Sequence, residues 1–195
     1  MTAAAARVRS APSPRPTADQ VREILIVDDH PLMCDALALT LKISFGLKNV
    51  RTARSLATAV EQIRQQGAPD AVILDLNLPD ARGAEGIVTL RRQLPGVPIT
   101  MISADLEGAM ITTAMAAGAQ GYISKSLSRE ALVDSLRRMW DGERVTPDGY
   151  EPAQDGDDDE ARADLARRFA SLTPQQMKIL RLICQGKANK EISYE

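Results

Sequence analysis

Short apolar runs that alternate with helical patterns are the feature that most limits how this chain can fold. Each run is nearly all apolar and rich in β-branched residues, as expected for strands that are buried on both faces. The run at residues 49–53 is the weakest. We expect five strands, at Ile24–Val27, Asn49–Ala53, Ala71–Leu74, Ile99–Ile102 and Gly121–Ile123.

Helical periods separate these runs. Apolar residues recur there at steps of three and four residues, which is typical of helices with one buried face. The clearest stripes are Met33, Leu37 and Leu41, then Ile87, Leu90 and Leu94, then Leu132, Val133, Leu136, Met139 and Trp140. Five strands that alternate with five helices indicate an α/β fold, a doubly wound parallel sheet with helices on both faces.

Composition excludes several classes of protein. A chain of 195 residues suffices for one domain, or for one domain plus a piece, at roughly 100–200 residues per domain. Aromatic residues make up only 3%, which disfavours a surface that stacks nucleic-acid bases. No apolar run reaches the roughly 18 residues of a membrane span, so we expect no membrane partner. With only Cys34 and Cys184, the chain has no disulfide framework, which favours a cytoplasmic protein. Two cysteines and one histidine are also too few for a typical structural zinc site.

Charge and composition divide the chain into four regions. Residues 1–21, rich in Ala, Pro and Arg, are expected to be a disordered N-terminal extension. Residues 22–142 carry the strand and helix pattern. Residues 143–169 are expected to be an acidic linker, because acidic side chains outnumber basic ones ten to two within residues 141–164. Residues 170–195 are basic and helical in pattern, which indicates the start of an interaction module.

Polar side chains stand where the predicted strands end. Asp28 and Asp29 follow the first strand, Asp75 the third, Ser103 the fourth and Lys125 the fifth. Functional groups collect at the carboxyl ends of the strands of an open parallel sheet. We therefore expect three carboxylates, one hydroxyl and one amine to converge on one edge of the sheet.

Three neighbouring carboxylates repel one another unless a cation neutralises them. Oxygen ligands with open positions suit Mg²⁺, which keeps several waters and accepts phosphate oxygens. Asp29 and Asp75 are the expected direct ligands, with the backbone carbonyl of Asn77 as a third. Asp75 would then be a carboxylate nucleophile that forms an acyl phosphate. Lys125 and Ser103 would contact the phosphoryl oxygens.

This constellation resembles the receiver domain of two-component response regulators. The resemblance covers roughly residues 22–142. It rests on the segments ILIVDDH (24–30), VILDLNLP (72–79), MISA (101–104) and AGAQGYISK (117–125), together with Gly83. It implies a flavodoxin-like (βα)5 fold with strand order 2-1-3-4-5.

The resemblance also implies roles for the residues. Asp75 accepts the phosphoryl group from a sensor histidine kinase or phosphotransfer protein, and Asp28 and Asp29 are the acidic pair for Mg²⁺. Ser103 and Tyr122 form the switch pair. Beyond self-phosphorylation from a phosphodonor and self-dephosphorylation, no enzyme activity is implied. Phosphorylation is expected to favour a homodimer, either through the first and fifth helices or through the fourth helix with the fifth strand.

Three positions keep other readings open. His30 is expected to be structural and to point off the strand end. Asp28 alone could cap the helix that begins near Pro31. Receivers often have proline after the lysine, but here Lys125 is followed by Ser126, so the sequence leaves the cis or trans state of that bond open.

Residues 172–195 (LTPQQMKILRLICQGKANKEISYE) resemble the start of a LuxR-type (NarL/FixJ-like) helix-turn-helix. Thr173 suits the N-cap and Pro174 the first position of a helix, Gly186 suits its end, and a second helix begins near Asn189. The recognition helix that would enter the major groove is not among these residues. We therefore expect a truncated output domain, and DNA as a partner only for an intact one.

The resulting reading is a response regulator whose receiver switches a transcription-regulatory, DNA-binding output. A receiver-only decoy or phosphate sink without DNA-binding output is the alternative. A phosphohydrolase with an aspartate nucleophile, of the haloacid-dehalogenase kind, is disfavoured. Such enzymes want a second aspartate at the position that Asn77 occupies.

Overall fold

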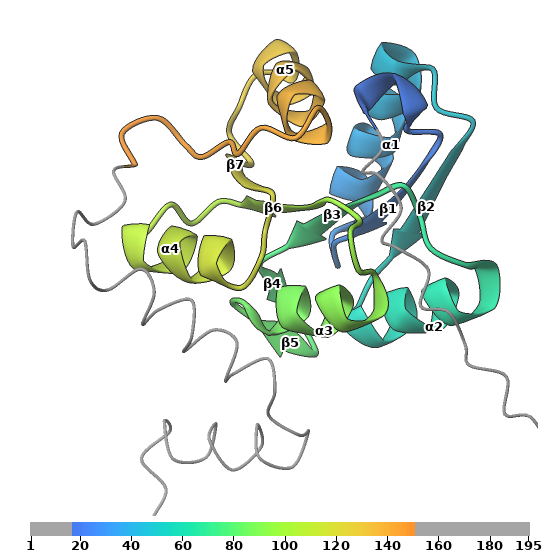
Figure 1. Cartoon of the computed structure of the whole chain (residues 1–195), viewed down its shortest axis with the longest axis horizontal. Helices are drawn as coiled ribbons and strands as arrows, with labels where there is room; N and C mark the ends of the chain where they lie inside the picture. Colours follow the sequence, from blue (N-terminus) through green and yellow to red (C-terminus); the bar gives the residue numbers. More distant parts are fainter. Residues whose placement is uncertain (1–16, 151–195) are drawn as a thin grey trace, which may run out of the picture. The chain divides into compact units, whose positions relative to one another are not determined.

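A five-stranded parallel sheet forms the centre of the computed structural model, which describes residues 17–150 (Figure 1). Its strands are β1 (Glu23–Val27), β2 (Asn49–Ala53), β3 (Ala71–Asp75), β6 (Ile99–Ser103) and β7 (Gly121–Ser124). Every predicted strand is confirmed to within one residue at each end. The order across the sheet is β2-β1-β3-β6-β7, which is the expected 2-1-3-4-5 once a short hairpin outside the sheet is left out of the count.

Five α-helices cover both faces of this sheet (Figure 1). They are α1 (Pro31–Phe45) and α5 (Arg129–Trp140) on one face, and α2 (Leu56–Gln66), α3 (Glu85–Gln93) and α4 (Gly108–Ala116) on the other. Each face has its own apolar core, because successive side chains of a strand point to opposite sides. Ile24 and Ile26 lie in the core under α1 and α5, whereas Leu25 and Val27 lie in the other. In the part of the chain that the structure describes, no helix combines the length and the apolarity needed to cross a membrane.

A small antiparallel hairpin, absent from the prediction, follows β3 directly. It consists of β4 (Asn77–Leu78) and β5 (Ala81–Arg82). Asp80, at its turn, accepts hydrogen bonds from the backbone N–H groups of Leu56 (2.9 Å) and Ala57 (2.8 Å) in the first turn of α2. The carboxylate thereby satisfies helix N–H groups that have no partner within the helix. Asp80 thus fixes the hairpin to the start of α2. The hairpin follows Asp75 closely in the sequence.

The folded unit begins earlier than predicted. Residues Ala18–Gln20 form a short 3-10 helix, and Ala18 and Val21 are buried in the core under α1 and α5. The N–H of Ala18 donates to Asp141 Oδ1 at 2.9 Å. The predicted extension of residues 1–21 is therefore too long at its C-terminal end. Residues 1–16 lie outside the described part of the chain.

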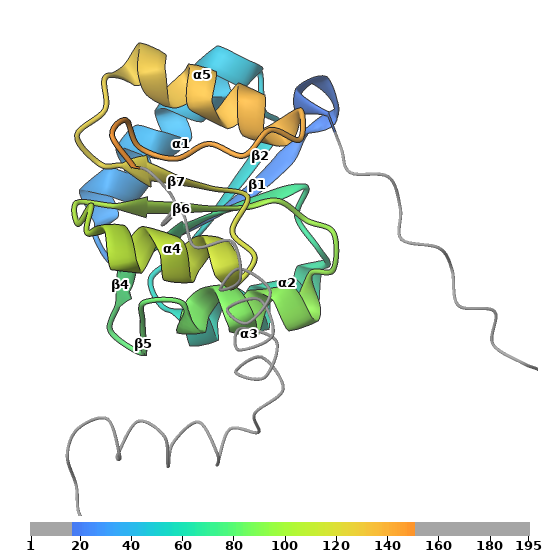
Figure 2. The ribbon, with the colours of Figure 1, turned by 60° about the vertical axis from the view of Figure 1, so that its left-hand side comes forward.

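Residues 143–150, which we call the strap, pack on the folded domain (Figure 2). The sequence pattern had assigned them to the acidic linker. Val145 is buried, forms a parallel bridge with Gly121, and accepts a hydrogen bond from the Tyr122 N–H at 2.8 Å. Tyr150 Oη lies 2.8 Å from Thr112 Oγ1 on α4. The strap covers the edge of β7 that would otherwise present unpaired backbone groups. The rest of the predicted linker, residues 151–169, lies outside the described residues.

Gly121 makes the close approach of the strap possible. A Cβ atom at this position would overlap with Met139 Sδ and would lie 2.6 Å from the carbonyl oxygen of Val145. We expect Gly121→Ala to lower the free energy of unfolding by about 1–3 kcal/mol, because overpacking forces side chains and backbone to shift. Urea denaturation followed by Trp140 fluorescence measures this loss.

Gly108→Ala is the matched control, because no heavy atom lies within 4 Å of a Cβ built at Gly108. We expect this variant to keep the stability of the unmodified protein. If both alanine variants unfold at the same urea concentration, the strap does not depend on a small residue at position 121.

Candidate functional site

Asp28, Asp75 and Lys125 meet at the carboxyl edge of the sheet, as predicted. Asp28 follows β1 and is fully buried, and Asp75 ends β3 and is only 4% exposed. Lys125 follows β7, and its Nζ lies 2.9 Å from Asp28 Oδ2 and 2.9 Å from Asp75 Oδ2. Since β1, β3 and β7 are parallel, their ends present these three side chains at one place.

Burial and the ion pairs shift the pKa values of Asp75 and Lys125. Burial raises the pKa of Asp75 above its ordinary value, and the charge of Asp28 adds to the rise, while Lys125 offsets part of it. Burial alone would lower the pKa of Lys125, but its contacts with Asp28 and Asp75 raise it overall. Lys125 is therefore a firmly held cation between two carboxylates.

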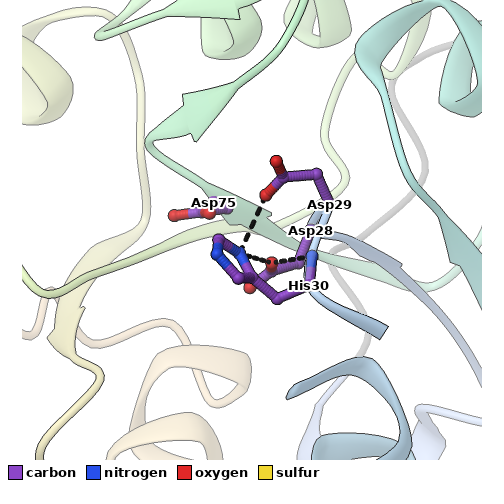
Figure 3. A group of neighbouring side chains, drawn as sticks. All are labelled: Asp28, Asp29, His30 and Asp75. Carbon is purple, nitrogen blue, oxygen red and sulfur yellow. Dashed lines mark hydrogen bonds and ion pairs between the residues drawn. The ribbon is translucent and has the colours of Figure 1, made fainter. Parts of the chain in front are cut away.

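Asp29 and His30 complete the acidic cluster from the loop after β1 (Figure 3). His30 Nδ1 lies 3.0 Å from Asp28 Oδ1 and 2.8 Å from Asp29 Oδ1. The imidazole is largely exposed, and His30 is also the N-cap residue of α1. The sequence prediction left His30 outside the site and considered Asp28 as the cap. The position of His30 directly after Asp28 and Asp29 could have indicated that it belongs to the site.

The donor set fits a divalent cation. One ligand atom from each of Asp28, Asp29, His30 and Asp75 lies within 4.8 Å of the others. Three carboxylates and one lysine leave an excess of two negative charges when all are ionised. Carboxylate oxygens in such a cluster suit Mg²⁺, which commonly binds through one or two carboxylates and several waters.

Ser103 and Tyr122, the predicted switch pair, are both fully buried. Ser103 ends β6, next to Ile102, which is paired with Asp75 in the sheet. The backbone of Asp105 links the two side chains: its N–H donates to Ser103 Oγ (3.0 Å), and its carbonyl accepts from Tyr122 Oη (2.6 Å). Burial raises the pKa of Tyr122. Sequence reasoning missed Asp105, although its place two residues after Ser103 is typical of hydroxyl turns.

Two further positions complete the loops around Asp75. Asn77 begins β4, and its backbone N–H hydrogen-bonds the carboxylate of Asp75. The peptide bond between Lys125 and Ser126 is trans, since residues 17–150 contain no cis bond. Ser126 Oγ lies 2.7 Å from Ser124 Oγ, which ties the loop after Lys125 back to the end of β7.

Two regions of the chain match known protein families. Residues 24–137 match the response regulator receiver domain, and residues 170–195 match the luxR family of bacterial regulatory proteins. The predicted helix-turn-helix residues Thr173, Pro174 and Gly186 fall in that second match, outside the described residues.

Individual relatives are similar to most of this chain or to its larger part. The transcriptional regulatory protein MctR of Rhizobium johnstonii is 31% identical over 87% of this chain and 76% of its own length. The nitrate/nitrite response regulator protein NarL of Escherichia coli is 30% identical over 87% of this chain and 78% of its own. A crystal structure of a LuxR family DNA-binding response regulator from Silicibacter pomeroyi is 27% identical, with a TM-score of 0.59 over 67% of this chain and all of that one. The chain therefore belongs to the two-component response regulators, in which a receiver domain is joined to a LuxR-type region for transcription regulation.

Proposed function

We propose that Asp75 accepts a phosphoryl group from a sensor histidine kinase or phosphotransfer protein and thereby switches the protein's DNA-binding output. The observation that carries this proposal is the convergence of Asp28, Asp75 and Lys125, with both lysine contacts at 2.9 Å. A buried carboxylate beside a fixed cation can act as a nucleophile toward a group that carries negative charge.

The transfer forms one bond and breaks one. An oxygen of the ionised Asp75 attacks phosphorus, and the bond from phosphorus to the imidazole nitrogen of the donor breaks, with the electron pair remaining on that nitrogen. The product is an aspartyl phosphate. Lys125 moves from its carboxylate contacts to a phosphoryl oxygen and balances the added charge. Hydrolysis by water later returns Asp75 to a carboxylate, and the protein is otherwise not an enzyme.

Asp29 and Asp75 would hold Mg²⁺ directly, with Asp28 beside them and the backbone carbonyl of Asn77 as a further ligand. The ion supplies positive charge that offsets the negative charge of the phosphoryl oxygens. The chain's own part is to keep three carboxylates close together although they repel one another. Lys125 does this through its ion pairs with Asp28 and Asp75. The ring of His30 lies within hydrogen-bond distance of Asp28 and Asp29.

Ser103 would transmit the phosphorylation of Asp75 to the neighbouring loop. A phosphoryl group on Asp75 gives the Ser103 hydroxyl a new acceptor, and a move toward it would weaken the bond to the Asp105 N–H. Because the Asp105 carbonyl also holds Tyr122, the loop before α4 and the ring of Tyr122 would shift together. We propose that this shift changes the association of two copies and the DNA binding of the LuxR-type region, in the cytoplasm.

Phosphoryl uptake by the full chain from a small phosphodonor tests the proposal. With Mg²⁺ we expect a slower band in phosphate-affinity electrophoresis, which hydroxylamine removes and which excess EDTA prevents. Reduction of the acyl phosphate by borohydride followed by peptide mass analysis should mark Asp75. A hydroxylamine-resistant phosphate, or a label on another residue, would contradict the proposal.

A further inference from the structure

The hairpin that follows Asp75 cannot hold its conformation alone. Each of its strands, β4 and β5, is two residues long, and an isolated hairpin is at best marginally stable in water. Its turn consists of Pro79 and Asp80, between the paired residues Leu78 and Ala81. Two-residue turns that match the twist of paired strands need a positive φ angle, and among the described residues only glycines have one. The hairpin therefore depends on contacts with the rest of the domain.

Two kinds of contact supply this support. Leu78 and Ala81 are buried in the core that also contains Leu56 of α2. The polar contact comes from Asp80, whose Oδ1 accepts a hydrogen bond from the Leu56 N–H (2.9 Å) and whose Oδ2 accepts one from the Ala57 N–H (2.8 Å). Both carboxylate oxygens are engaged, and hydrogen bonds to an ionised group are roughly twice as strong as neutral ones. The turn is therefore held by two bonds at the first turn of α2.

Asn77 lies on the same hairpin, three residues before Asp80, and belongs to the site. Its backbone N–H hydrogen-bonds the carboxylate of Asp75, and its backbone carbonyl is the further Mg²⁺ ligand proposed above. Asn77 pairs with Arg82 across the hairpin, so a shift of the turn would change the direction of the Asn77 carbonyl. Mg²⁺ demands near-ideal octahedral geometry. This ligand therefore has to be held in one orientation.

We propose that Asp80 is a positioning residue of the phosphorylation site, which keeps the Asn77 carbonyl directed at Mg²⁺ by fixing the hairpin to the start of α2. The inference rests on the proposed function and adds a residue to it. Asp80 acts through Asn77, because it is not one of the side chains whose ligand atoms gather at the site. Ion binding thereby depends on α2, a helix that carries none of the proposed ligands.

Titration calorimetry of the full chain with Mg²⁺ tests this inference. Asp80→Ala should raise the Mg²⁺ dissociation constant about tenfold, a typical effect of removing a group that holds a metal ligand in place. Asp80→Asn keeps one acceptor oxygen and should lie between Asp80→Ala and the unmodified chain. Because Asp80 is exposed, neither change leaves a cavity in the core. Both variants should keep the circular dichroism spectrum of the unmodified chain.

Ser55→Ala is the matched control for the loss of a helix cap. Ser55 Oγ accepts a hydrogen bond from the Thr58 N–H (3.1 Å) and so caps the same end of α2 from the helix's own segment. Like Asp80→Ala, this variant should unfold at a lower urea concentration, but its affinity for Mg²⁺ should be unchanged. Equal affinities of Asp80→Ala and the unmodified chain would overturn the inference. An equal loss of affinity in Asp80→Ala and Ser55→Ala would also overturn it.

Phosphoryl uptake from a small donor separates this inference from the proposed function. Asp80→Ala should take up phosphate slowly at low Mg²⁺ and at nearly the normal rate when Mg²⁺ is saturating, because Asp75 and Lys125 are unchanged. A variant that stays slow at saturating Mg²⁺ would show that Asp80 does not act through the ion, and the inference would be wrong. If the unmodified chain takes up no phosphate, the proposed function fails, and the Mg²⁺ affinities still decide whether Asp80 positions the ligand.

Discussion

Replacing Asp75 with asparagine is expected to abolish phosphoryl uptake and, in the same variant, to stabilise the receiver. Uptake is lost because the amide is not a nucleophile, while Asp28, Asp29 and Lys125 remain in place. The gain in stability follows from burial, which makes an ionised Asp75 unfavourable in the folded protein. We expect a gain of about 0.5–2 kcal/mol at neutral pH, as is common when a strained functional site is relieved.

The pH dependence of this gain has a definite sign. The folded-state pKa of Asp75 is raised above the ordinary value of 3.8, so the folded protein holds that proton more firmly than the unfolded chain. The contribution of Asp75 to the stability of the unmodified protein therefore falls as pH rises from about 3.8 through the raised pKa. The asparagine variant has no such group. The free energies of unfolding of the two proteins, measured by urea denaturation, should be nearly equal at the acidic end of this pH range and should differ at higher pH.

Asp70→Asn is the control for the change of charge. Asp70 lies outside the site and accepts hydrogen bonds from the N–H groups of Arg22 (2.8 Å) and Glu23 (2.9 Å). This variant should keep phosphoryl uptake and gain no stability. Equal uptake by Asp75→Asn and the unmodified chain would refute the assignment of the acceptor.

Replacing Lys125 with alanine is expected to lower the free energy of unfolding by about 3–5 kcal/mol, the usual loss when one partner of a buried ion pair is removed. The amine contacts two carboxylates that are themselves almost wholly buried. Without it, Asp28 and Asp75 repel each other across a site of low dielectric constant. Trp140 is the only tryptophan of the chain and is buried, so its fluorescence reports the unfolding.

The same variant should bind Mg²⁺ more tightly, because the cluster loses its internal positive charge. Titration calorimetry measures the affinity, and added Mg²⁺ should recover part of the lost stability by mass action. Lys48→Ala removes a charge from an exposed position after α1 and should alter neither quantity. A loss below about 1 kcal/mol, with unchanged affinity for Mg²⁺, would show that Lys125 does not hold the carboxylates together.

The sheet and the core of the site were predictable because both follow from local patterns. Apolar, β-branched runs such as Ile24–Val27 and Ile99–Ile102 mark buried strands, and parallel strands place their carboxyl ends together. The meeting of Asp28, Asp75 and Lys125, separated by up to 97 positions along the chain, thus followed from the strand pattern alone. The trans bond after Lys125 did not, since both isomers fit the sequence.

The strap and the hairpin were missed because their contacts leave no periodic signal. Each strand of the hairpin is two residues long, too short to show alternation. Val145 is surrounded by polar and charged residues in the sequence, and its pairing with Gly121 and Tyr122 uses backbone groups that every residue carries. His30 was missed for another reason: the direction of a side chain at a helix start depends on backbone angles that its neighbours do not reveal.

Tyr122 carries two hydrogen bonds that lead to different parts of the domain. Its hydroxyl holds the carbonyl of Asp105 beside Ser103, and its backbone N–H holds the carbonyl of Val145 in the strap. The amide proton of Tyr122 should therefore exchange with solvent slowly while the strap is seated, and faster once it lifts. If phosphorylation of Asp75 moves the ring of Tyr122 as proposed, the NMR signal of this amide would report both the phosphorylation and the release of the strap.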